Sequence, residues 1–237
     1  MNGFDILDEF SNEELSILVE IIIKKGDLTE ELSSNSKYKQ YAPDHKQYVD
    51  VIKDELSRYA GNSFANLVRG YGVSYREMLI DVCKETKTPF NEDSSLERIE
   101  NSLLEKVLMD TWENLSEEKR QEILGQIPGM KWEGVSTAAL ITIFRAGGFT
   151  SYQILVIFAN TVAKALVGRG LSVLANAALT RTFSILTGPI GMSLTALYTV
   201  LTFAGPAYRV TAPATIYIAS LRQIHQSKYF KDLLASQ

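Results

Sequence analysis

Acidic residues are missing from most of the second part of the sequence, where none occurs between Gly134 and Lys231. Residues 1–133 hold 16 Lys and Arg against 27 Asp and Glu, whereas residues 134–237 hold 8 against one, so the two parts carry net charges of −11 and +7. This asymmetry indicates that the two parts meet different surroundings or partners. The acidic surplus of the first part would repel phosphates, which excludes a general nucleic-acid-binding protein.

Cysteine and histidine are also scarce. The single Cys83 excludes an intramolecular disulfide, and its place beside Leu79 and Val82 on an apolar helix face predicts a small buried residue. The two histidines, His45 and His225, lie far apart in the sequence and lack metal-ligand spacing, so we expect no metal site.

Catalytic and phosphate-binding motifs are absent from the sequence. It contains no Walker-type loop, no G-x-S-x-G and no G-x-G-x-x-G. We therefore expect no catalytic residues, no cofactor and no enzymatic activity. An enzyme that acts on a lipid or a small molecule is the alternative, which a convergent cleft of polar side chains would support.

The opening residues, MNGFDILDEF, lack the basic start and the apolar run of a secretory signal. We therefore expect a cytoplasmic protein, which would lie at the inner membrane or insert into it only through its later segments.

Amphipathic helices account for what is present in the first part. Ser11 with Glu14, and Ser74 with Glu77, have the spacing of capping boxes that begin helices. A further helix is predicted to start with Pro43 in its first turn and to end at Gly61. Leucine, isoleucine and valine at helical spacing predict a long helix over 94–115, and a shorter one should follow over 116–127.

Beyond residue 134 the sequence is apolar and is divided by glycine. The stretch IPGMKWEGVS, residues 127–136, predicts a break between an acidic helical domain over 1–130 and an apolar, basic helical region over 134–237 that packs on it. Glycines then separate five apolar segments, at 136–145, 149–167, 171–187, 190–204 and 210–224. Since no run alternates as a strand would, the predicted fold class is all-α, a multi-helix bundle.

One charge-free stretch, residues 182–208, is long enough in principle to cross a membrane. Its 27 residues would form a helix of about 40 Å. Pro189 and the Gly205-Pro206 pair shorten that helix to residues 190–204, or about 22 Å, which is typical of a buried, re-entrant or interfacial helix.

The isolated cations of the second part allow two interpretations. They could face anionic lipid, at about 1 kcal/mol for each basic residue. Alternatively, the two halves dock, and carboxylates from the first part neutralise these cations. For the first interpretation, the predicted membrane-contacting residues are Arg145, Lys164, Arg169, Arg181, Phe183, Leu194 and Tyr198.

A polar cluster at residues 59–82, which we call the 59–82 corner, combines Arg, Tyr and Asn with turn glycines. Arg and Tyr together suit recognition of a phosphate, a carboxylate or a protein surface. The alternative is a helix–turn–helix corner whose polar groups satisfy its own caps. The predicted partner-binding residues are Asn62, Asn66, Arg69, Tyr71, Tyr75 and Arg76.

The sequence resembles the bacterial YaaW family. The resemblance is carried by GNSFANLVRGYGVSYREMLIDV, by AYRVTAPATIYIASLRQI and by the opening FDILDEFSNEELSILV. That family is grouped with the ubiquinol–cytochrome c chaperones. The resemblance implies an all-helical domain at about residues 30–130 that aids assembly of a membrane protein complex, and it implies no catalytic residues.

Two functions are therefore predicted. The first is a non-enzymatic helical protein that associates with a membrane surface or a membrane protein through its apolar, basic C-terminal half, as a monomer or a homo-oligomer. The alternative is a soluble assembly chaperone that binds a partner protein through the 59–82 corner.

Overall fold

The structure is a computed structural model that describes residues 3–26, 30–61, 73–113, 116–124, 135–167 and 208–227, together with residue 232. Throughout these ranges the regular elements are helices, which confirms the all-α prediction. The α-helices are α1 (Asn12–Gly26), α2 (Ser36–Tyr41), α3 (Val49–Gly61), α4 (Tyr75–Glu85), α5 (Leu96–Glu113), α6 (Glu117–Leu124), α7 (Thr137–Ala146), α8 (Gly148–Val167) and α11 (Tyr208–Gln226).

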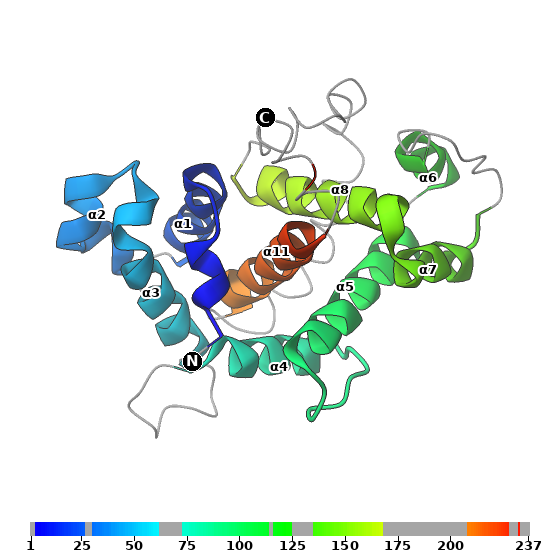
Figure 1. The fold of residues 1–237 in the computed structure, drawn as a ribbon, viewed down its shortest axis with the longest axis horizontal. Coiled ribbons are helices and arrows are strands. Elements are labelled where there is room, and N and C mark those ends of the chain that lie inside the picture. Colours follow the sequence, from blue (N-terminus) through cyan, green and yellow to red (C-terminus); the bar gives the residue numbers. More distant parts are fainter. Residues whose placement is uncertain are drawn as a thin grey trace.

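Helix α11 occupies the centre of the molecule, and the other helices surround it (Figure 1). It packs against α1, α3, α4, α5 and α8, so it contacts helices from both the acidic and the apolar part of the sequence. Every residue from Val210 to Leu221 is buried, as expected of a helix that is covered on all sides. The apolar segment predicted at 210–224 is therefore the core helix.

Polar side chains inside α11 bond to the helix itself. Thr215 Oγ1 donates to the carbonyl of Thr211 (2.7 Å), and Ser220 Oγ donates to that of Ile216 (2.8 Å). Because each hydroxyl is satisfied four residues back along its own helix, it can be buried at little cost.

Both predicted capping boxes are present. Glu14 accepts from the backbone N–H of Ser11 (2.7 Å), and its own N–H donates to Ser11 Oγ (3.2 Å). Ser74 and Glu77 make the same reciprocal pair at the start of α4. The sequence signal and the local structure therefore agree at these helix starts.

The helix predicted to begin with Pro43 is wrong at its start. A 3-10 turn, His45–Tyr48, precedes α3, and Pro43 lies in the loop after the short α2. The backbone N–H of Lys46 donates to Asn12 Oδ1 on α1 (2.9 Å). This tertiary bond uses a donor that a helix through Pro43 would need, so packing overrides the local signal.

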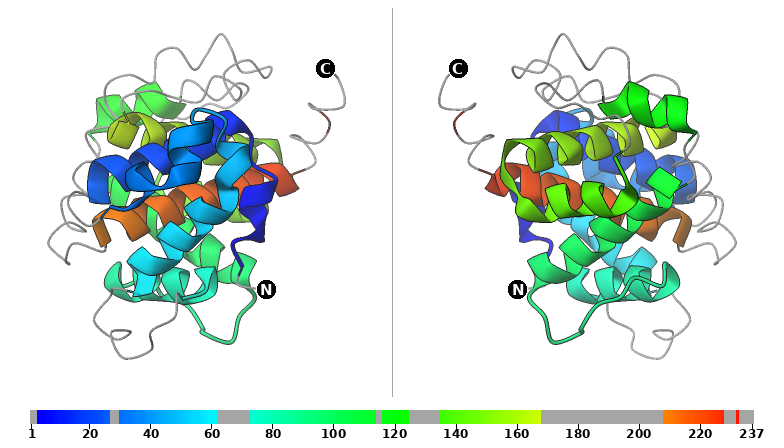
Figure 2. Two further views of the ribbon diagram at one scale, coloured as in Figure 1. Left: turned by 90° about the vertical axis from the view of Figure 1, so that its left-hand side faces the viewer. Right: turned by 90° about the vertical axis from the view of Figure 1, so that its right-hand side faces the viewer.

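Helices α7 and α8 meet at the Gly147-Gly148 pair. Both glycines have positive φ, +68° and +82°, which side-chain-bearing residues rarely adopt, and the two helices are bent by 111°. This turn puts α7 and the start of α8 at one end of the molecule, while α2 and α3 lie at the other (Figures 1 and 2). The predicted segments 171–187 and 190–204, and most of the predicted break at 127–136, lie outside the described residues.

Candidate functional site

A buried ion pair joins α11 to α5 in the core. Arg222 of α11 donates through Nε to Glu100 Oε1 of α5 (3.0 Å), and Tyr75 Oη of α4 donates to the same oxygen (2.8 Å). Arg222 Nη2 also donates to the carbonyl of Gly3 (3.1 Å), and its guanidinium lies 5.5 Å from the centroid of the Tyr75 ring. This Arg222–Glu100–Tyr75 network therefore holds three helices and the N-terminal segment together.

Burial dominates the electrostatics of this network. The Glu100 side chain has no exposed area, and that of Arg222 is 12% exposed. Desolvation raises the pKa of Glu100 to about 7, and the nearby Arg222 charge and the Tyr75 hydrogen bond only partly oppose it. Burial and the Glu100 charge likewise raise the pKa of Tyr75. The groups bind one another, so the network acts as a structural link.

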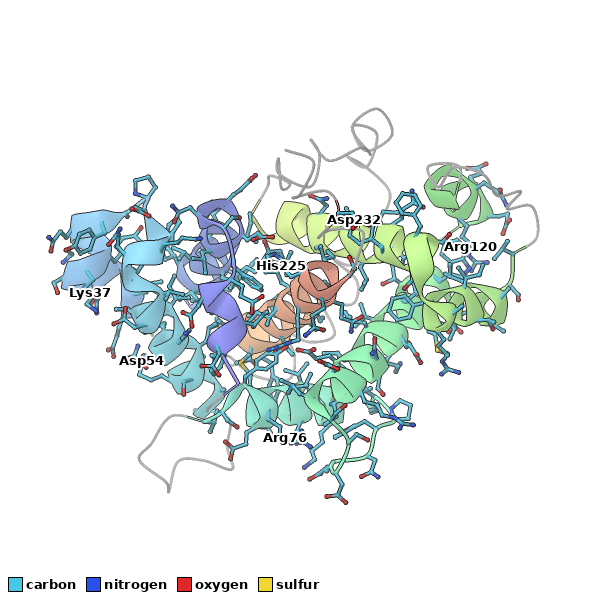
Figure 3. The ribbon with its side chains drawn as sticks, viewed as in Figure 1. Lys37, Asp54, Arg76, Arg120, His225 and Asp232 are labelled. Atoms are coloured by element: carbon cyan, nitrogen blue, oxygen red, sulfur yellow. The ribbon has the colours of Figure 1, made fainter. Side chains whose placement is uncertain are left out.

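A second polar link ties the end of α11 to the start of α1. His225 Nε2 lies 2.9 Å from Glu14 Oε1, while Glu14 Oε2 accepts the capping bonds of Ser11. Tyr217 Oη donates to the Glu14 carbonyl (3.3 Å), and the Phe10 ring packs beside His225 with centroids 5.3 Å apart. Figure 3 shows His225 at the centre of the molecule. Sequence reasoning missed this pair, because two residues 211 positions apart carry no shared local signal.

An exposed ion pair joins α7 to α5. Arg145 binds Glu105 in bidentate fashion, with Nε–Oε1 and Nη2–Oε2 distances of 2.9 and 2.7 Å, and the Arg145 side chain is 66% exposed. Two cations of the second part, Arg145 and Arg222, thus pair with carboxylates of the first part.

Apolar side chains are exposed around the turn between α7 and α8, which we call the α7–α8 corner (residues 137–157). Phe149 is 45% exposed and stacks on Tyr152 with centroids 6.2 Å apart. Met109, one turn beyond Glu105 on α5, is 38% exposed. The exposed positions of α7 itself carry small residues, Ala138, Ala139, Thr142 and Ala146, beside Arg145.

Hydropathy singles out the same corner. No single helix in the described ranges is long and apolar enough to span a membrane. Helix α7 and residues Gly148–Ile157 together reach that length and hydropathy, but as a bent pair.

The structure describes two of the six predicted partner-binding residues. Tyr75 is fully buried in the network above, so it does not lie at a surface. Arg76 Nη2 donates to the carbonyls of Glu92 and of Ser94, the latter at 2.7 Å, and so holds the loop between α4 and α5. Asn62, Asn66, Arg69 and Tyr71 lie outside the described residues, and their role stays a prediction.

Among the predicted membrane-contacting residues, Arg145 is placed at the α7–α8 corner and Lys164 lies on α8. The other five lie outside the described residues: Arg169, Arg181, Phe183, Leu194 and Tyr198.

Neither cysteine chemistry nor a metal cluster is found in the described part of the chain. Cys83 is buried, as predicted, and burial raises the pKa of its thiol to about 12, so it stays protonated and unreactive. No three His, Cys, Asp or Glu side chains gather there as metal ligands would.

Comparison with known proteins defines the class. The family model of the ubiquinol-cytochrome C chaperone matches residues 44–216, and the chain belongs to that family. It is 39% identical to a UPF0174 protein of Helicobacter pylori over 92% of this chain and 89% of that protein. It is 32% identical to the UPF0174 protein YaaW of Escherichia coli over 94% of each. These relatives confirm the resemblance to the YaaW family. No solved structure matches the chain.

The two ion pairs between the halves should contribute very differently to the free energy of unfolding of the protein. Arg222→Ala leaves the Glu100 carboxylate buried without its cation and should lower the free energy of unfolding by about 3–5 kcal/mol. Arg145→Ala removes an exposed, solvent-screened pair and should change the free energy of unfolding far less. Urea unfolding of the full chain measures both losses, and equal losses would contradict a core role for the Arg222–Glu100 pair.

The raised pKa of Glu100 predicts a pH dependence. Folding raises the pKa of Glu100 from 4.5 to about 7, so the folded state binds more protons than the unfolded state. The protonated Glu100 therefore contributes its full share to the free energy of unfolding below pH 4.5, and this share is lost as the pH rises through 7. Between pH 5.5 and 8 the free energy of unfolding of the unchanged chain should therefore fall by about 2 kcal/mol more than that of Glu100→Gln, whose side chain does not titrate. Glu105→Gln serves as the control and should keep the original slope in urea unfolding.

Proposed function

We propose that the protein is a non-enzymatic helical protein that associates with a membrane, or with a protein embedded in it, through its apolar, basic C-terminal half. The observation that carries the proposal is the α7–α8 corner, where a bent apolar helix pair, an exposed Phe149 and Arg145 meet in a part of the chain without acidic residues.

The physical basis is interfacial binding. An aromatic ring and small apolar side chains gain free energy in the acyl boundary, and a cation beside them is attracted to lipid phosphates. Arg145 is bound to Glu105 at an exposed position, so exchanging this carboxylate for a phosphate costs little. The corner would then lie in the headgroup region on the cytoplasmic face of the inner membrane.

The buried charged side chains are engaged in structural contacts, which supports a chaperone role without catalysis. Glu14, Glu100, His225 and Arg222 are engaged with each other or with neighbouring groups in the two polar links. The matched family model is named after a chaperone, and a chaperone assists another protein.

Vesicle flotation tests membrane association. The full chain should float with vesicles that contain anionic lipid and less with zwitterionic ones. Phe149→Asp should lower the bound fraction about tenfold, because it removes the burial of one aromatic side chain. Tyr41→Asp is the matched control, since Tyr41 is also exposed, at 37%, but lies on α2. A full chain that floats with neither vesicle, or a Phe149→Asp variant that floats normally, contradicts the proposal.

The second candidate is a soluble assembly chaperone that binds its partner protein through the 59–82 corner. One observation supports it: the matched family model covers this corner.

Substitutions in the corner separate this candidate from a structural role. Arg69→Ala and Tyr71→Ala should each abolish co-purification of the partner without lowering the melting temperature. Arg76→Ala should lower the melting temperature, because the α4–α5 loop loses two hydrogen bonds. If Arg69→Ala and Tyr71→Ala both unfold the protein instead, the corner is structural.

A further inference from the structure

A groove lies between α1 and α2. These two helices lie at the end of the molecule opposite the α7–α8 corner (Figures 1 and 2). The volume of the groove is about 460 Å³, and α1, α2 and the loop before the His45–Tyr48 turn enclose it. The residues that line it are Asn12, Glu13, Ser16, Val19, Glu20, Ile23, Tyr38, Ala42, Pro43 and His45.

The α1 wall of the groove is one stripe of the helix. Asn12, Ser16, Glu20 and Ile23 recur at spacings of three and four residues, so they lie above one another on the same face. The stripe extends over three turns, or about 16 Å at 1.5 Å per residue. The length suits a helical segment of comparable extent better than it suits a compact small molecule.

The opposite wall is held in place by bonds that do not involve any ligand. Asn12 Nδ2 donates to Asp44 Oδ1 (2.9 Å), and Asn12 Oδ1 accepts from the backbone N–H of Lys46 (2.9 Å). The Tyr38 ring packs edge-on against Tyr48, with centroids 5.9 Å apart. The groove is therefore pre-formed, so little ordering entropy would be lost on binding.

The lining has a definite chemistry. Ile23, Tyr38 and Pro43 provide apolar surface above the buried Val19, and Glu13 and Glu20 provide carboxylates. No Lys or Arg is among the lining residues, although Lys24 reaches Glu20 from the end of the stripe (2.9 Å). Apolar side chains flanked by Lys or Arg would complement this surface, whereas an anionic ligand would be repelled.

We propose that this groove binds a short amphipathic helix of a partner protein, with an apolar face toward Ile23 and Tyr38 and with Lys or Arg side chains toward Glu13 and Glu20. Helix-in-groove recognition uses apolar anchors at the same three- and four-residue spacing. The site lies at the other end of the molecule from the α7–α8 corner, and it does not depend on the membrane proposal.

Binding of two synthetic peptides to the full chain tests the proposal by fluorescence anisotropy. One labelled 14-residue peptide carries Leu on one helical face and Lys on the other, and the second has Glu in place of every Lys. The Lys peptide should bind and the Glu peptide should not. The double variant Glu13→Gln, Glu20→Gln should weaken binding about tenfold.

A matched variant distinguishes the groove from diffuse attraction by the acidic half. Glu117→Gln with Glu118→Gln removes the same charge from α6, a helix at the opposite end of the molecule from α1 and α2 (Figure 1), and should leave the affinity unchanged. Equal weakening by the two double variants would overturn the proposal.

Photocrosslinking locates the peptide directly. A benzophenone group on the apolar face of the Lys peptide should label residues 12–23 and 38–45, and Ile23→Asp, at a partly exposed lining position, should abolish this labelling. Labelling elsewhere would overturn the proposal, as would sedimentation showing that a second copy of the chain occupies the groove.

Discussion

The burial of α11 on all sides is the constraint on which the rest of the structure depends. A helix surrounded by five others needs partners for its polar side chains inside the core. Thr215 and Ser220 bond back to carbonyls of the helix itself, and Tyr217 donates to the Glu14 carbonyl. Arg222 reaches Glu100, and His225 reaches Glu14. Each partner helix is thereby fixed in direction, because a buried donor without its acceptor would cost several kcal/mol.

The basic second part and the acidic first part of the sequence meet in the structure as individual ion pairs. Arg222 and Arg145 both meet carboxylates of α5, but one pair is buried and the other is exposed. The buried pair therefore specifies how the helices pack, whereas the exposed pair leaves its cation accessible at the edge of the apolar corner. The same sequence pattern thus gives a buried structural pair at Arg222 and a solvent-exposed pair at Arg145.

Local signals in the sequence predicted much of the fold. Ser74 with Glu77 marked the start of α4, and Gly147-Gly148 marked the turn between α7 and α8, because caps and glycine turns depend on neighbouring residues alone. The start of α3 was not predictable in this way, since Asn12 captures the Lys46 N–H from another helix. The same holds for the Glu14–His225 pair and for the groove on α1, which exist only after distant segments have packed.

The position of α11 in the chain has a consequence for how the protein is made. Its residues, 208–226, follow all the other described helices, yet they supply the centre around which those helices pack. While the ribosome is still synthesising this segment, the earlier helices lack the surface that they bury in the finished protein, and Glu14 and Glu100 lack their partners. The core therefore closes only after translation of residue 226, through contacts between residues that are more than 100 positions apart. A nascent chain of this protein is open at its centre until its last described helix arrives.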